Sequence, residues 1–109
     1  MIKDFVWKVP GKIKYVIDAD TFHAEIDLGW NRRLENVRIR FSNIDAPPLG
    51  TPEGDAGKDY LARILPEGRI VVIESEELDQ YGRVLGLVKL LNGHDVGKKL
   101  VRAGHATLR

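Results

Sequence analysis

Three aspartates stand beside turns in the first half of the chain. Asp18 and Asp20 flank one alanine between two alternating, strand-like runs, and Asp45 follows a third such run and precedes two prolines. Residues two apart in a strand share a face, so Asp18 and Asp20 can project together. If the first and third strands have their ends together, Asp20 and Asp45 converge as well. Under that condition the spacing predicts a facing pair of carboxylates.

A facing pair of carboxylates favours a bound cation, because the two negative charges repel each other. Two carboxylates and a nearby backbone carbonyl supply hard oxygen ligands for Ca²⁺, which takes about 6–8 oxygens and accepts water for the remainder. The alternative is an Asx turn at a hairpin, in which the acids around Ala19 bond only to nearby backbone. These residues alone leave both interpretations open.

Two arginines are candidates for phosphate binding. Arg40 belongs to the polar face of the third alternating run, and Arg83 follows the tight turn "DQYG". A guanidinium can hold two phosphate oxygens at once, and it stabilises the charge that builds on phosphorus during displacement. Two such groups beside a metal would suit a phosphodiester. The alternative for each is a solvated surface arginine.

Composition sets few limits on function. The 109 residues fit one domain, residues 1–109. A net charge of +1 neither demands nor excludes a nucleic-acid partner. The chain has no cysteine, and its three histidines form no cluster, so we expect each histidine to be structural or exposed. With no signal-like or membrane-spanning apolar run, we expect a cytoplasmic protein without a membrane partner; the alternative is secretion with a leader that has been removed. We also expect a monomer without an evident protein partner.

Periodicity predicts the elements that must position these residues. Five alternating or β-branched segments indicate strands, at residues 12–18, 21–29, 37–43, 69–75 and 83–91. Helical spacing predicts helices at residues 55–65 and 95–104, and polar or Pro/Gly-rich composition predicts loops at residues 30–36 and 47–54. We therefore predict an α+β, mainly β fold: a five-stranded OB-type barrel with a helix between strands three and four and a short C-terminal helix. Another small α+β fold is the alternative.

Four short motifs occur in an order that resembles the staphylococcal nuclease (thermonuclease) family. They read "VIDADTF", "RFSNIDAPP", "DQYGR" and "KKLVRAGHA", and the resemblance covers roughly residues 11 to 106. Each motif is weak alone, and their combination on a matching element order is much more specific. The resemblance implies a five-stranded OB barrel with helices, and Ca²⁺-dependent hydrolysis of DNA and RNA that leaves 3′-phosphate ends.

The resemblance also implies roles for the candidate metal site. Asp20 and Asp45 are similar to the calcium carboxylates of the family. Ala46 falls where a backbone carbonyl contributes to the ion, a role that does not depend on the side chain. Asp18 matches an acid that supports the metal site.

For the substrate, the resemblance implies three further roles. Arg40 matches the strand arginine that binds the scissile phosphate, and Arg83 matches a second arginine that stabilises the transition state. Tyr81 corresponds to a tyrosine near the bound nucleotide.

One position departs from the family pattern. The motif normally reads Asp, a small residue, Pro and then Glu, and this glutamate orients or deprotonates the attacking water. Pro48 takes its place here and has no acid or base. Glu53 and Asp55 follow in the same segment and are possible substitutes, although acids at the start of a helix also favour its positive end.

These observations support two classes of function. The first is a Ca²⁺-dependent nuclease-like phosphodiesterase acting on DNA or RNA, weakened by Pro48. The alternative is a non-catalytic OB-fold module that binds nucleic acid through the same charged groove. An interaction module that merely reuses the barrel is a third possibility.

Overall fold

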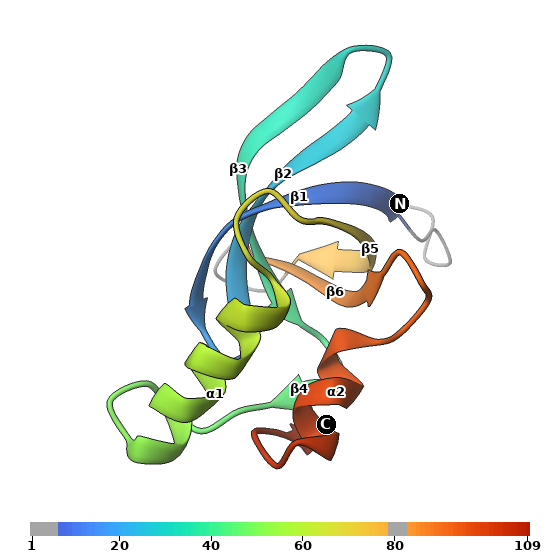
Figure 1. The fold of residues 1–109 in the computed structure, drawn as a ribbon. Coiled ribbons are helices and arrows are strands. Elements are labelled where there is room, and N and C mark those ends of the chain that lie inside the picture. Colours follow the sequence, from blue (N-terminus) through green and yellow to red (C-terminus); the bar gives the residue numbers. More distant parts are fainter. Residues whose placement is uncertain (1–6, 79–82) are drawn as a thin grey trace.

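A closed barrel of five strands forms the body of the computed structural model, which describes residues 7–78 and 83–109 (Figure 1). The strands are β1 (Trp7–Asp18), β2 (Thr21–Gly29), β3 (Arg32–Phe41), β5 (Ile70–Leu78) and β6 (Val84–Leu90). They follow one another around the barrel in the order β1, β2, β3, β6, β5. All neighbours run antiparallel except β3 and β6, which are parallel. The predicted OB-type barrel is confirmed.

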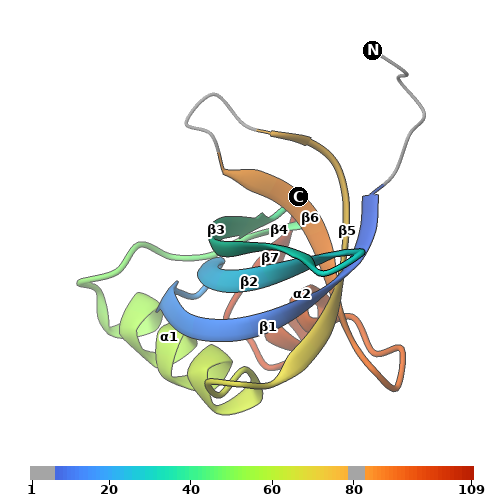
Figure 2. The same ribbon diagram turned by 90° about the horizontal axis from the view of Figure 1, so that it is seen from above.

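Two helices and a small second sheet lie at one end of this barrel (Figure 1). Helix α1 (Pro52–Ile64) connects β3 to β5 and packs against β1, and α2 (Val96–Arg102) follows β6. Two-residue strands β4 (Ile44–Asp45) and β7 (Thr107–Leu108) pair antiparallel. Figure 2, turned by 90°, shows the strong curvature of the barrel strands and α1 lying alongside β1. Among the described residues, no helix is long and apolar enough to cross a membrane.

The barrel interior is filled by the apolar side chains that the alternating pattern predicts. Phe22, Ala24 and Ile26 of β2 are buried, and the Phe22 ring meets that of Phe41 edge-on with centroids 5.7 Å apart. Leu61 of α1 and Leu100 of α2 close the end of the core. Burying side chains of this size contributes about 1.5–3 kcal/mol each to the folded state.

The predicted loop at residues 30–36 is wrong. Strand β3 starts at Arg32, and only Trp30 and Asn31 form the turn, with φ angles of 54° and 62°. Positive φ at both turn residues matches the type I′ turn, whose twist suits a hairpin. The β2–β3 hairpin extends past the barrel, where its residues are exposed on both faces (Figure 1). Because neither face is buried, alternation is absent, and Leu28 is 43% exposed.

The predicted start of the first helix is also wrong. Helix α1 begins at Pro52, three residues before the predicted residue 55. The Thr51 side chain accepts a hydrogen bond from the Gly54 N–H at 3.0 Å, and proline suits the first helical position because its missing N–H would have no partner there. The prolines and glycines of this segment therefore belong partly to a capped helix.

Thr51 also fastens the loop before α1, which gives a stability prediction. Its hydroxyl donates to the Pro48 carbonyl at 2.7 Å while accepting from Gly54. We expect Thr51→Ala to lower the free energy of unfolding by about 1–2 kcal/mol, because both bonds are lost. Thr51→Ser keeps the hydroxyl and should stay within about 0.5 kcal/mol of the native protein in urea unfolding. Equal losses for the two variants would contradict the capping role.

Candidate functional site

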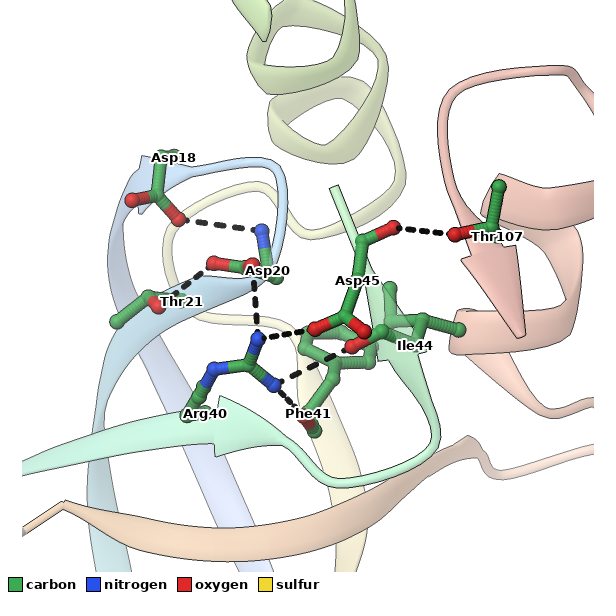
Figure 3. A network of polar contacts seen from close by, with 8 residues as sticks. All are labelled: Asp18, Asp20, Thr21, Arg40, Phe41, Ile44, Asp45 and Thr107. Carbon is green, nitrogen blue, oxygen red and sulfur yellow. Dashed lines mark hydrogen bonds and ion pairs between the residues drawn. The ribbon is translucent and has the colours of Figure 1, made fainter. Parts of the chain in front are cut away.

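Pairing between β2 and β3 brings the predicted acids and one predicted arginine together (Figure 3). Asp20 lies in the β1–β2 turn, and its neighbour Thr21 pairs with Arg40 near the end of β3. The Phe41 N–H donates to the Asp20 carbonyl at 3.0 Å and holds the turn against the strand end. Asp45 follows in β4. Contacts between residues far apart in the sequence therefore place both carboxylates beside one guanidinium.

The Arg40 guanidinium joins both carboxylates. Its Nη2 lies 2.9 Å from Asp45 Oδ1 and 3.3 Å from Asp20 Oδ2. Its Nη1 donates to the backbone carbonyls of Phe41 and Ile44. The side chain is only 12% exposed, so the alternative of a solvated surface arginine is wrong. Arg40 is the cation that offsets the two acids in this structure.

Burial disfavours the ionised form of the Asp20 side chain. Burial raises its pKa above the ordinary value, and the neighbouring carboxylate of Asp18 raises the pKa further. Arg40 opposes this shift, as does the Thr21 hydroxyl, which donates to Asp20 Oδ1 at 3.0 Å. Since the pKa remains raised, the positive charge of Arg40 does not fully offset the burial of the acid. Additional positive charge at this place would stabilise the ionised carboxylate.

Asp18 forms the Asx turn that was the alternative interpretation. The Asp20 N–H donates to Asp18 Oδ1 at 3.1 Å, the two-residue spacing of that motif. The two acids of "DAD" therefore do different things, because Asp18 shapes the turn while the Asp20 side chain reaches Arg40. A supporting role for Asp18 at a metal stays a prediction.

Asp45 is more open to solvent than Asp20, with 55% of its side chain exposed. Its backbone is held by pairing with Thr107 of β7, and the Thr107 hydroxyl donates to its carbonyl at 3.5 Å (Figure 3). Ala46 and Pro47 join it in lining an open cavity of about 310 Å³ that faces residues 104–107. One carboxylate of the pair is thus accessible to a ligand from outside.

The remaining predicted substrate residues lie beside β3 or outside the described part of the chain. Arg83 immediately precedes β6, whose first residue, Val84, pairs with Ile39, the neighbour of Arg40. Arg83 is half-buried there. Tyr81 lies outside the described residues.

Two acids follow Asp45 at the start of α1, and each has a local structural role there. Pro48 is exposed, and its carbonyl accepts from Thr51. Asp55, a possible substitute acid, accepts a hydrogen bond from the Gly50 N–H at 3.0 Å and so braces the loop. Glu53 is exposed in the first turn of α1, where its charge suits the helix terminus.

The groups that hold Asp20, Arg40 and Asp45 in place were not predicted from the sequence. The Thr21 hydroxyl orients Asp20, and "DADT" contained that signal as a hydroxyl directly after the acid. The carbonyls of Phe41 and Ile44 that bind Arg40 had no signal, because every residue has a carbonyl. The same holds for the pairing of Asp45 with Thr107, since a two-residue strand has no period.

The donor chemistry fits a hard cation such as Ca²⁺. Asp20 and Asp45 supply carboxylate oxygens, which Ca²⁺ prefers, whereas zinc sites usually include nitrogen or sulfur ligands. Within residues 7–78 and 83–109 there is no group of three or more histidines, aspartates and glutamates placed for one metal. The remaining oxygens would therefore come from backbone carbonyls and water.

Comparison with known proteins places this chain in a family. A family model described as "Staphylococcal nuclease homologue" matches residues 38–109, which include Arg40 and Asp45. The chain belongs to this family. Asp18 and Asp20 precede the matched residues. The resemblance inferred from the four motifs is confirmed.

Several relatives of this nuclease family extend the similarity towards the N-terminus. Endonuclease YhcR of Bacillus subtilis (strain 168) is 37% identical over 109 residues, which cover 88% of this chain and 8% of that protein. An uncharacterized endonuclease of Escherichia coli is 36% identical over 98 residues, covering 90% of this chain and 60% of the relative. Micrococcal nuclease of Shigella flexneri is 36% identical over 78 residues, or 72% and 41% of the two chains. The chain thus spans less than two thirds of the length of each of these relatives.

Proposed function

We propose that this chain is a Ca²⁺-dependent phosphodiesterase that hydrolyses DNA, RNA or both. The observation that carries the proposal is the position of Arg40 between two carboxylates, one largely buried and one open to solvent. Membership of the staphylococcal nuclease homologue family and the endonuclease names of its relatives support the same conclusion. An open cavity lies beside Asp45, the solvent-exposed carboxylate of the pair.

In this proposal Asp20 and Asp45, with the Ala46 carbonyl and water, hold the ion. Bound Ca²⁺ would polarise a phosphoryl oxygen and lower the pKa of a bound water. The Asx turn at Asp18 and the hydroxyl of Thr21 keep the Asp20 carboxylate in its orientation. These contacts reduce the reorganisation that binding a cation requires.

The two arginines bind the substrate phosphate. The Nη2 group of Arg40 bonds to both carboxylates. When the substrate binds, this Nη2 group exchanges a carboxylate oxygen for a phosphate oxygen. Its Nη1 stays bonded to the carbonyls of Phe41 and Ile44, which keeps the guanidinium in position. Arg83 approaches the phosphate from the start of β6. Together they offset the charge that develops on phosphorus during attack by water.

Pro48 makes the reaction slow, because the attacking water has no glutamate to receive its proton. General-base catalysis contributes about 10²–10⁴-fold where it is present. The same observation favours the second candidate, a module that binds nucleic acid through Arg40 and Arg83 without cleaving it. Cleavage measured against binding separates the two.

The test combines cleavage with a calcium measurement that does not depend on turnover. We expect plasmid and single-stranded DNA to be cleaved with Ca²⁺ but not with EDTA. Ca²⁺ at ten times its Kd should stabilise the protein by about 1.4 kcal/mol in thermal unfolding. Asp20→Asn should lose this stabilisation and at least about tenfold in cleavage, because it removes one charged ligand.

Asp59→Asn is the matched control, because it removes an exposed acid of α1 that is not one of the carboxylate pair. It should keep both the cleavage and the response to Ca²⁺. Calcium stabilisation that survives Asp20→Asn would show that the ion binds elsewhere. Binding of DNA without cleavage in Ca²⁺ would favour the non-catalytic module.

A further inference from the structure

A stacked pair of rings stands on the outer face of β1 and β2, close to the candidate site. Tyr15 pairs in register with His23, and their rings are nearly parallel, with an angle of 13° and centroids 4.8 Å apart. Tyr15 is 52% exposed. Neither ring belongs to the core, and neither was assigned a role above. The pair therefore presents an aromatic surface to solvent.

The pair is held in place by its neighbours. The Nδ1 atom of His23 lies 2.7 Å from Oδ1 of Asn36, within hydrogen-bond distance. A bulge in β1 between Ile13 and Tyr15 changes the register against β2 just before the ring. A ring fixed in this way loses little conformational entropy when a flat ligand stacks on it.

Two arginines of β3 lie beside the pair, one opposite His23 and one two residues closer to the candidate site. His23 pairs with the exposed Arg38 of β3, and Thr21, two residues earlier, pairs with Arg40. Arg38 and Arg40 share a face of the strand and are about 7 Å apart along it. This distance is close to one nucleotide step along an extended backbone.

Along β2 away from the candidate site, the outer face carries a negative charge. The next outward residue after His23 is Glu25, which lies 3.8 Å from Arg33. An anionic chain would therefore run from Arg40 past Arg38, and not further towards the tip of the hairpin. The stacked rings lie in the same row across the sheet as Arg38, two residues along β3 from Arg40.

We propose that Tyr15, His23 and Arg38 form a second nucleotide subsite, which stacks an unpaired base of single-stranded nucleic acid on Tyr15 and binds the adjoining phosphate at Arg38. The inference rests on the proposed function, because it takes the phosphate position at Arg40 as its starting point. Bases in a duplex are stacked on each other and cannot reach the rings. The subsite therefore selects single strands over double strands.

Binding in EDTA tests the subsite without cleavage. The probe is a fluorescein-labelled oligothymidylate of about ten nucleotides, followed by fluorescence anisotropy. We expect Tyr15→Ala to weaken binding by about 5- to 150-fold, the usual range for loss of one stacked base. Tyr15→Phe keeps the ring and should bind like the native protein. Tyr15→Thr, which suits a strand, serves as a second ring-free variant if the alanine variant unfolds.

A second probe of the same length, with abasic sugars in place of all bases, identifies stacking. The native protein and the ring-free Tyr15 variants should bind it equally, because it offers nothing to stack. Arg38→Ala should weaken both probes and lower the salt dependence by about one phosphate contact. Arg63→Ala, which removes an exposed arginine from the last turn of α1, should leave both unchanged.

Three results would overturn the subsite, and the first two leave the proposed function untouched. Binding of the base-containing probe that is insensitive to loss of the Tyr15 ring would exclude stacking there. Equal loss on the abasic probe would show that the ring acts only through the fold. A native protein that binds neither probe would refute the nucleic-acid partner itself, and the subsite with it.

Discussion

Replacing Arg40 by alanine is expected to lower nuclease cleavage by about 10²–10³-fold, the usual effect of removing one donor to the developing charge. It should also lower the free energy of unfolding by about 2–4 kcal/mol. The stability loss has a local cause. Without the guanidinium, the carbonyls of Phe41 and Ile44 lose their donor, and the largely buried Asp20 has only the like charge of Asp18 beside it. Urea unfolding and cleavage of a labelled strand measure the two effects separately.

Calcium distinguishes the two roles of Arg40. Ca²⁺ should still stabilise Arg40→Ala against heat, because both carboxylates remain and their competing internal cation is gone. Arg40→Lys keeps the charge but lacks the planar fork that reaches carboxylates and carbonyls together, so it should recover stability only in part. Arg63→Ala, the exposed arginine control on α1, should change neither property. Full cleavage by Arg40→Ala at a temperature where it is folded would contradict the phosphate role.

Replacing Pro48 by glutamate is expected to raise Ca²⁺-dependent cleavage at least about tenfold, the cautious end of the range for a general base. The local structure accommodates this change. Pro48 is exposed, and only its backbone carbonyl is engaged, by the hydroxyl of Thr51. Glutamate supplies the same carbonyl. Helix α1 approaches the Pro48 backbone closely at Gly54, where an added Cβ would lie 2.0 Å from the Pro48 oxygen. This contact involves the backbone of residue 48, so a glutamate side chain there leaves it unchanged.

Pro48→Gln is the matched control for this gain. Its side chain has the same length as that of glutamate but cannot accept a proton at neutral pH, so cleavage should stay near the native level. A rise in both variants would point to loop flexibility after loss of the proline. No rise in Pro48→Glu, with unchanged thermal stability, would show that an acid at this position cannot reach the attacking water.

The barrel followed from the sequence because its signals are local. In β2, Phe22, Ala24 and Ile26 alternate with polar residues, and that pattern depends only on neighbours two positions apart. The pattern is lost at residues 32–36, where the hairpin leaves the barrel and burial no longer imposes alternation. At Thr51 and Pro52 the many prolines and glycines predict a loop, whereas the Thr51 cap and a proline in the first helical turn start a helix there.

By itself, the sequence determined the residue types available for chemistry and the strands that bear them. Asp20, Arg40 and Asp45 could be named as candidates from their chemistry and their positions in the predicted strands, and the resemblance to the staphylococcal nuclease family implied that they form one site. The Asx turn at Asp18 is local, but only the tertiary structure decided that Asp20 reaches Arg40 and that Asp45 is open to solvent. The physical reason is the long separation in sequence between the residues that make contact. These outcomes depend on pairings between segments 20 or more residues apart, such as Thr107 with Asp45 across 62 residues, and no local pattern encodes such pairings.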